Sequence, residues 1–294
     1  MIDRRAFLLA GSAAALAACR TRTAAPLAPA DTALADIRAR LGAGARLGVA
    51  AVDTSSGARL ALDPDGRYAM CSTFKAPLAA MVLAEAERGT LALDDELAVS
   101  RADLVDNSPA AAAALPLGRM TIEAMCAAIV QVSDNAAANL LLARLGGPPA
   151  FTAFVRRCGD PATRLDRVEP ELNSNRPGDL RDTTTPAAML GLIRGLLVGE
   201  LLSPASQARL AGWMVGATTG LDRLRAGLPA GWRAGDKTGT ANSANNDIAV
   251  AWPPGRPPIL IASYIDAPAP THAERNAAHA AVARAVTAAF TSRL

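Results

Sequence analysis

Lysine and aromatic residues are scarce in this 294-residue chain. Phe, Trp and Tyr together make up 3% of it, which disfavours a surface that stacks nucleic-acid bases. The net charge is +3, and no basic run is longer than a pair, so we expect no nucleic-acid partner. Of the 30 Lys and Arg residues, 28 are arginine, and the two lysines are Lys75 and Lys237. A chain that otherwise uses arginine has kept lysine at two positions, which makes both candidates for chemistry.

Histidine is equally rare. His272 and His279 lie seven residues apart in the last predicted helix, far from any candidate serine motif, and there is no G-x-S-x-G. A Ser-His-Asp hydrolase would therefore lack its ordinary base, and a zinc site would lack clustered ligands. We expect no metal and no other cofactor, and we expect both histidines to be surface or helix-packing residues.

The first 19 residues have the pattern of an export signal. Arg4 and Arg5 precede an apolar stretch too short to span a bilayer, and small residues lead to Cys19. R-R-x-F-L resembles a twin-arginine signal, and L-A-A-C resembles the lipobox of bacterial lipoproteins. We expect an exported, periplasmic protein, attached to a membrane through a lipidated Cys19, with residues 20–30 as a flexible tether. The alternative is an ordinary secretory signal with an incidental cysteine.

Cysteine is sparse in the rest of the chain. Cys71, Cys126 and Cys158 remain beyond the signal, and three thiols cannot all pair internally. Although export implies an oxidising compartment, we expect no disulfide that folding requires.

The order of predicted elements indicates one catalytic unit, residues 31–294, with two lobes. Residues 46–62 read as two strands around a turn, and 72–214 read as mainly helical. Strand patterns return in 231–240, 246–252 and 258–266, before a final helix over 272–294. The terminal strands can share a sheet only if the chain ends meet. We therefore predict an α/β lobe (31–70 and 215–294) beside a helical lobe (71–214), with the site in the cleft between them.

Ser72 and Lys75 form the first candidate pair. A residue three positions further along a helix lies on the same face, and a helix N-terminus suits a developing oxyanion. Lysine can lose its proton when buried, whereas arginine cannot. The alternative is a helix cap followed by a solvated lysine.

Two further short motifs each have a plain structural explanation. Ser133-Asp134-Asn135 lies between two helical stretches, where Ser or Asp can cap the helix that begins near Ala136. Lys237-Thr238-Gly239-Thr240 lies on a predicted strand, where lysine can guard a sheet edge. Alternatively, the glycine indicates close approach by another group, and hydroxyls beside a cation suit an anionic ligand.

Taken together and in this order, S-x-x-K, S-D-N and K-T-G resemble the motif set of class A β-lactamases and the related penicillin-binding proteins. The segment RLDRVEPELNSNRPGDLRDTTTP resembles the omega loop of the class A enzymes. Its E-x-x-L-N element, Glu169 to Asn173, is absent from penicillin-binding proteins. Arg164 and Asp182 match the ion pair that holds the ends of that loop in the family. Glu169-Pro170 matches a family position at which the peptide bond is cis.

The resemblance implies an α+β fold of two lobes, with an antiparallel sheet flanked by N- and C-terminal helices and an all-helical lobe. It also implies hydrolysis of the amide of penicillins and cephalosporins through an acyl-enzyme, which gives antibiotic resistance. The catalytic residues would be Ser72, Lys75, Ser133, Glu169 and Asn173. The substrate would be held by Asn135, Lys237, Thr238, Thr240 and Arg223, with the backbone N–H groups of Ser72 and Thr240 as the oxyanion hole. Whether Lys75 or Glu169 takes the serine proton stays open.

Three positions depart from patterns found in some members. Cys126 and Cys71 each match half of a disulfide, but the partner positions are Ala79 and Ala241. The second departure makes carbapenem hydrolysis less expected. Asn107 lies where many members have an aromatic residue at the cleft entrance.

The alternatives are a slow D,D-peptidase or penicillin-binding protein, a non-catalytic β-lactam sensor, and an interaction protein with the same fold. Each would lack efficient turnover at Ser72. We expect a monomer whose partner is a small-molecule β-lactam.

Overall fold

The computed structural model describes residues 28–174 and 176–291. The predicted export signal, with Cys19, lies outside this part. Helix α1 runs from Ala28 to Arg40 and so includes the last three residues of the predicted tether, 20–30, whose bounds stay a prediction.

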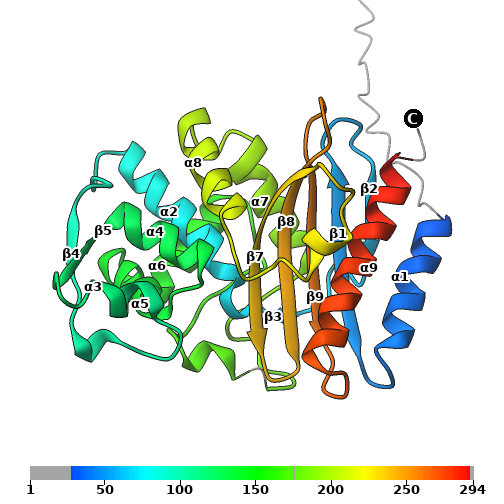
Figure 1. Cartoon of the computed structure of the whole chain (residues 1–294), viewed down its shortest axis with the longest axis horizontal. Helices are drawn as coiled ribbons and strands as arrows, with labels where there is room; N and C mark the ends of the chain where they lie inside the picture. The colour runs from blue at the N-terminus through cyan, green and yellow to red at the C-terminus, as the bar shows by residue number, and fades with distance from the viewer. Residues whose placement is uncertain (1–27, 175, 292–294) are drawn as a thin grey trace, which may run out of the picture.

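A five-stranded antiparallel sheet forms the centre of the larger lobe (Figure 1). Its strands, in the order β2-β1-β9-β8-β7, are β2 (Arg59–Leu62), β1 (Arg46–Asp53), β9 (Ile259–Asp266), β8 (Ala244–Trp252) and β7 (Arg233–Ala241). The first and last strands of the chain are therefore neighbours, as the sequence predicts. β7 lies at one edge of the sheet.

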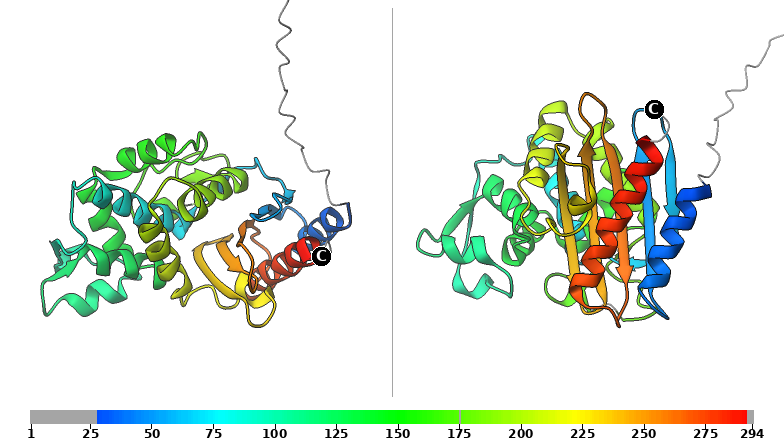
Figure 2. Two further views of the ribbon diagram at one scale, coloured as in Figure 1. Left: turned by 90° about the horizontal axis from the view of Figure 1, so that it is seen from above. Right: turned by 45° about the vertical axis from the view of Figure 1, so that its right-hand side comes forward.

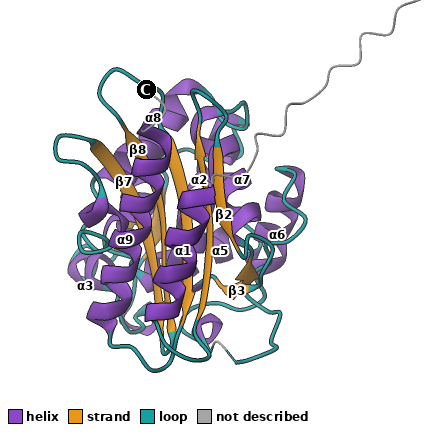
Figure 3. Cartoon of the chain, turned by 90° about the vertical axis from the view of Figure 1, so that its right-hand side faces the viewer, coloured by secondary structure: helices purple, strands orange, loops and turns teal. Residues whose placement is uncertain are grey.

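Helices cover both faces of this sheet. Helix α1 and the last helix, α9 (His272–Thr291), lie together on one face, and α7 (Pro186–Val198) packs on β1 and β9 from the other (Figures 2 and 3). Strand β1 serves both layers because its side chains alternate. Leu47 and Val49 join the core beneath α1 and α9, whereas Ala50 and Val52 join the core of the opposite face.

The helical lobe is built around α2 (Lys75–Glu87). Residues 75–84 of this helix are all buried, and it contacts helices on every side, as expected of a helix that is apolar all round. The other helices of this region are α3 (Pro109–Ala114), α4 (Ile122–Gln131), α5 (Asn135–Arg144), α6 (Gly147–Arg157) and α8 (Pro204–Val215). Among the described residues, no helix is both long enough and apolar enough to cross a membrane.

Two small ribbons are additional to the predicted elements. β4 (Glu96–Ala98) pairs with β5 (Arg119–Thr121), and β3 (Tyr68–Ala69) pairs with β6 (Thr183–Thr184). Strands of two or three residues are too short to show a periodic pattern in the sequence. The β3–β6 ribbon connects the first lobe to the end of the predicted omega loop. The exact lobe boundaries near residues 70 and 214 stay a prediction.

Candidate active site

Ser72 lies at the junction of the lobes, in a 3₁₀ turn (Cys71–Phe74) that leads directly into α2. Lys75, the first residue of α2, is fully buried, and its Nζ donates to Ser72 Oγ at 3.0 Å. The three-residue spacing thus brings hydroxyl and amine together, and Lys75 is not a solvated lysine. Cys71 has a φ of +45°, which turns the chain sharply into the helix.

The turn before α5 carries the second motif, Ser133-Asp134-Asn135, which both caps the helix and contributes to the site. Asp134 is the cap: its carboxylate accepts from the backbone N of Ala137 at 2.9 Å. The residues on either side serve Lys75 instead. Lys75 Nζ donates to the Ser133 carbonyl at 2.9 Å, to the Ser133 hydroxyl at 3.3 Å and to Asn135 Oδ1.

Strand β7 brings in the second lysine. Lys237 is fully buried, so it does not guard the sheet edge. Its Nζ donates to Ser133 Oγ at 3.1 Å and to the Thr238 carbonyl at 2.7 Å. Gly239 is required here, because a Cβ on it would lie 2.6 Å from the Met70 carbonyl and 3.2 Å from Ser72 N. The edge of β7 and the backbone of Ser72 therefore lie face to face.

Glu169 completes the cluster from the omega loop. Its side chain is fully buried, with Oε1 3.0 Å from Lys75 Nζ and accepting from Ser72 Oγ at 3.2 Å. Asn173 Nδ2 donates to Oε2 at 2.5 Å. The Glu169–Pro170 bond is cis. A carboxylate and an amine thus contact a single serine hydroxyl, and an amide holds the other oxygen of that carboxylate.

Asn139, on α5, is a functional residue that the sequence reasoning missed. Its side chain donates to the Glu169 carbonyl at 2.8 Å and accepts from Glu169 N at 2.9 Å. It therefore fixes the backbone of the residue whose carboxylate meets Ser72. The signal was present, because Asn139 follows Asn135 by four residues on one helix.

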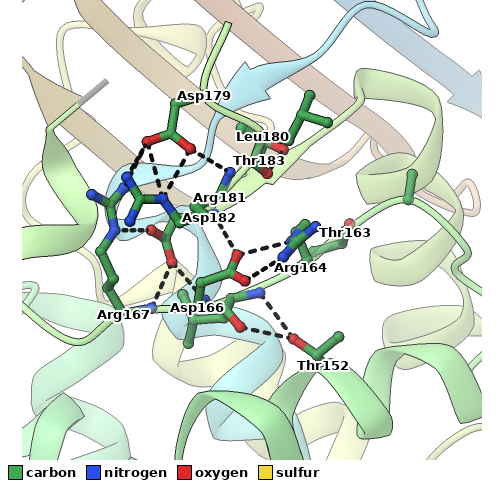
Figure 4. Close-up of polar contacts among 12 residues, drawn as sticks. Thr152, Thr163, Arg164, Asp166, Arg167, Asp179, Leu180, Arg181, Asp182 and Thr183 are labelled. Atoms are coloured by element: carbon green, nitrogen blue, oxygen red, sulfur yellow. Dashed lines mark hydrogen bonds and ion pairs between the residues drawn. The ribbon is translucent and has the colours of Figure 1, made fainter. Parts of the chain in front are cut away.

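The ends of the omega loop are held by a different arginine from the one predicted (Figure 4). Arg167 Nε donates to Asp182 Oδ2 at 2.6 Å, whereas Arg164 forms its ion pair with Asp166. The Arg164–Asp182 prediction is therefore wrong. Asp182 Oδ1 accepts from the backbone N–H groups of Asp166 and Arg167, at 2.7 and 3.0 Å. This contact turns the Arg167 side chain toward the buried carboxylate.

Arg223 comes to the site from the segment before β7. It is 3% exposed, and its Nη2 donates to Thr240 Oγ at 2.7 Å. The other guanidinium nitrogen of the fork, Nη1, donates to the carbonyls of Gly239 and Asn246 at 3.1 and 2.7 Å. Thr238 Oγ shares a 2.8 Å hydrogen bond with Thr219. Donor groups therefore line the β7 wall.

A cavity of about 270 Å³ opens over these groups. It brings together seven of the predicted site residues with two others: Ser72, Ser133, Asn135, Asn173, Arg223, Thr238 and Thr240, with Asn107 and Thr219. Lys75, Lys237 and Glu169 are outside this lining set and reach it through their hydrogen bonds to the two serines and Asn173. All ten predicted residues thus belong to one connected site.

Burial controls the charge of the two lysines. It lowers the pKa of Lys75, and the nearby Glu169 carboxylate opposes that change. Burial lowers the pKa of Lys237 well below its usual range, and the charge of Lys75 lowers it further. Ser133 Oγ lies within hydrogen-bond reach of both amines, so it can exchange a proton with either.

Some of the positions that differ from patterns found in other class A enzymes also lie close to the site. Asn107, with a φ of +57°, donates through its side chain to the Ser133 carbonyl at 2.8 Å. Cys71 is a free thiol in a small buried cluster with Ala69 and Ala244, and Ala241 packs against this cluster. Among residues 28–174 and 176–291, no three His, Cys, Asp or Glu side chains cluster as metal ligands.

Comparison with known proteins agrees with this geometry. Residues 30–290 match the family model described as the β-lactamase enzyme family. The chain is 44% identical to β-lactamase L2 of Stenotrophomonas maltophilia, over 97% of this chain and 98% of that protein. It is 47% identical to β-lactamase AST-1 of Nocardia asteroides, over 88% and 87% of the two chains.

Solved structures give the same answer for the whole architecture. An ancestral (GNCA) class A β-lactamase is 52% identical and superposes with a TM-score of 0.86, over 89% of this chain and all of the other. The serine and lysine at the start of α2, the second lysine on β7 and the buried glutamate of the omega loop thus occur on a matching framework. The chain therefore belongs to the β-lactamase enzyme family, as a class A serine β-lactamase.

Proposed function

We propose that this enzyme hydrolyses the β-lactam amide of penicillins and cephalosporins through an acyl-enzyme on Ser72, and so gives antibiotic resistance. One observation carries the proposal: the buried Glu169 carboxylate contacts Ser72 Oγ with one oxygen and Asn173 with the other. A base at this place can activate water against an ester on Ser72. Penicillin-binding proteins form the same ester without such a base.

Acylation begins at a hydroxyl that two groups can deprotonate. Lys75 Nζ and Glu169 Oε1 lie 3.0 and 3.2 Å from Ser72 Oγ, both within range for general base catalysis. While Lys75 is charged, it donates to Ser72, and Ser72 can donate only to Glu169. If Lys75 gives up its proton, which its burial favours, it can become the acceptor itself.

The tetrahedral intermediate needs donors for its oxyanion. The backbone N–H groups of Ser72 and Thr240 would supply them, and the close approach of Gly239 to Ser72 N supports that placement. Removing one such donor typically costs about 2.7–4 kcal/mol of transition-state stabilisation.

The departing lactam nitrogen needs a proton. Ser133 Oγ would supply it, because this hydroxyl lines the cavity and accepts hydrogen bonds from Lys75 at 3.3 Å and Lys237 at 3.1 Å. Either lysine can then replace the proton on Ser133.

The substrate's ionic and amide groups match the donors on the cavity walls. Thr238, Thr240 and Arg223 line the β7 side and would bind the substrate carboxylate, with the Lys237 amine behind Thr238. Asn135 lines the opposite side and would bind the side-chain amide. In the second half-reaction, Glu169 and Asn173 would hold and deprotonate the water that attacks the ester.

The test is time-resolved hydrolysis of a chromogenic cephalosporin, with intact-mass spectra, for wild type and Glu169→Ala. We expect rapid turnover by wild type and a trapped adduct on Ser72 in the variant. A wild-type enzyme that stops at one stable adduct would be a penicillin-binding protein or a sensor. No adduct and no turnover would contradict the proposed chemistry altogether.

We also propose that the enzyme is exported and attached to a membrane through Cys19, and that it acts as a monomer. The twin-arginine and lipobox patterns of residues 1–19 support export and attachment. Metabolic labelling with a fatty acid should mark the wild type and leave Cys19→Ser unlabelled. Light scattering of a form that begins at residue 28 should give the mass of one chain.

A further inference from the structure

His272, at the start of α9, contacts the carboxylate-binding arginine of the site. Its Nε2 lies 3.3 Å from Arg223 Nη2. On the other side of the ring, Nδ1 lies 3.3 Å from Asn276 Nδ2, one turn further along α9. A histidine that the motifs leave without a function therefore borders the substrate-binding wall.

The guanidinium of Arg223 has five N–H hydrogens, and each has one partner in this structure. Nε donates to Asn276 Oδ1 at 3.1 Å, and Nη1 donates to two backbone carbonyls. Nη2 donates to Thr240 Oγ and, through its second hydrogen, to His272 Nε2. The imidazole is thus the acceptor that holds the outer corner of the fork.

The hydrogen bond from Arg223 requires a neutral imidazole with its lone pair on Nε2. Arg223 always carries its proton, so His272 Nε2 must offer a lone pair. Asn276 Oδ1 accepts from both Arg223 Nε and Asn245 Nδ2, which turns the Asn276 NH₂ group toward His272 Nδ1. In the neutral ring Nε2 accepts from Arg223, so Nδ1 carries the hydrogen and the neighbouring Asn276 NH₂ group makes no hydrogen bond to it. An imidazolium would present an N–H to the Arg223 guanidinium as well and would have to leave this position.

The charges around the ring also favour the neutral form. Burial lowers the pKa of His272 from its usual 6.5, and the charges of Arg223 and Arg275 lower it further, while Asp222 opposes them. Arg223 and Asp222 face the ring from the segment before β7, and Arg275 lies on its own helix. Since the folded-state pKa is lowered, the neutral ring persists through the neutral pH range and charges only in acid.

We propose that neutral His272 is a positioning residue for Arg223, and that it sets the affinity of the enzyme for the substrate carboxylate in a pH-dependent way. Arg223 Nη2 lies between Thr240, on the cavity wall, and His272, on the outside. Loss of the outer acceptor leaves one Nη2 hydrogen without a partner and loosens the corner of the fork that faces Thr240 and the cavity. The proposal rests on the function proposed above, in which Arg223 binds that group.

The experiment measures kcat and KM for a penicillin and for its methyl ester, with wild type, His272→Ala and His272→Gln. For the acid, we expect His272→Ala to raise KM about three- to tenfold, the loss typical of one hydrogen bond, with kcat changed less than about twofold. The methyl ester has no carboxylate for Arg223, so the KM for the ester should be the same in wild type and in His272→Ala. Glutamine offers an uncharged acceptor and should restore a low KM.

The pH profile separates positioning from general packing. As the pH falls through the lowered pKa of His272, the wild-type KM for the acid should rise toward that of His272→Ala. The KM of His272→Gln should stay low. Ala277→Ser, on the exposed side of α9, is the matched control and should behave as wild type.

Equal KM values for wild type and His272→Ala across the pH range would overturn the inference. So would equal losses with acid and ester, because that result would mean a structural role, and the melting temperature of each variant would show it. Failure of the proposed function is a separate result, in which wild type turns over neither substrate.

Discussion

At the scale of single residues, the site consists of two serine hydroxyls, Ser72 and Ser133, that can exchange protons with buried amines and a carboxylate. Lys75, Lys237 and Glu169 are all buried, and they stay in the core because their polar atoms have partners. Only the ion pair between Lys75 and Glu169, at 3.0 Å, is a direct contact of opposite charges in this cluster. Proton transfer here needs no movement of a side chain over more than a hydrogen-bond length.

Lys75→Arg tests whether the proton on residue 75 takes part in the reaction. Arginine keeps the charge and the donor groups but cannot give up its proton. We expect kcat to fall about 10²- to 10⁴-fold, the usual contribution of general acid–base catalysis, measured by steady-state hydrolysis. Near-normal turnover would mean that Lys75 supplies only charge.

The matched control is Lys237→Arg at the other buried lysine. Because Lys237 contacts Ser133 rather than Ser72, and Lys75 can supply the Ser133 proton in its place, the Lys237 variant should lose less activity. Melting temperatures of both variants would show whether the larger side chain is accommodated. A loss of activity with a normal melting temperature is the informative result.

At the scale of elements, the omega loop depends on one buried ion pair. Asp182 is fully buried and is neutralised by Arg167, with two backbone N–H groups on its other oxygen. The Arg164–Asp166 pair lies beside it and is more exposed, since the Arg164 side chain is 42% accessible. The two arginines therefore contribute unequally to the stability of the loop.

Arg167→Ala should destabilise the enzyme by about 3–5 kcal/mol, because it leaves a buried carboxylate without its partner. The acyl-enzyme should also decay more slowly, since the loop carries Glu169. Arg164→Ala removes a surface pair and should cost about 0–1 kcal/mol. Urea unfolding and the decay of the adduct by mass spectrometry measure both effects. A larger loss of unfolding free energy in Arg164→Ala than in Arg167→Ala would restore the Arg164–Asp182 prediction.

The sequence shows why one part of this loop was predictable and another was not. E-x-x-L-N identifies Glu169 and Asn173, because Glu171 and Asn175 repeat the four-residue spacing but lack the leucine before the asparagine. Arg164 and Arg167 are three residues apart in the same loop, and neither residue type nor spacing tells which reaches Asp182. The choice depends on the path of the backbone, which brings the N–H groups of Asp166 and Arg167 onto the aspartate.

The same distinction holds for the fold. The long strands and helices were predicted because a hydrophobic period extends over many residues. The contact between His272 and Arg223, and that between Asn139 and Glu169, join elements far apart in the chain. No local pattern encodes such contacts, so they became visible only in the folded structure.

At the scale of the whole molecule, Asp53 connects distant segments at one end of the sheet. It lies at the end of β1 and accepts from Ser55, Ser56 and Arg256, the last from the β8–β9 loop. Burial alone would raise the pKa of Asp53, but these hydrogen bonds and the charge of Arg256 hold the pKa below its ordinary value. Its stabilisation is therefore complete above the unfolded pKa of 3.8 and lost as pH falls through the folded value.

Asp53→Asn should lower the unfolding free energy near neutral pH by about 1.5–3 kcal/mol, the usual effect of a hydrogen bond to a charged group. The difference from wild type should shrink below about pH 4, where the wild-type carboxylate becomes protonated. Denaturant titrations over this pH range measure the effect. Asp94→Asn, at an exposed position, is the control, and a difference that stays constant with pH would contradict the assignment.

The place of β9 in the sheet has a consequence for synthesis. This strand lies between β1 and β8, and its pairing with β1 joins residues 46–53 to residues 259–266. The ribosome makes β1 well before its central partner, because residues 54–258 separate β1 from β9 in the chain. Until β9 is made, β1 has only β2 as a neighbour, and a two-stranded hairpin is marginally stable in water. The central sheet of the nascent chain therefore stays incomplete until β9 has been synthesised and can pair with β1 and β8.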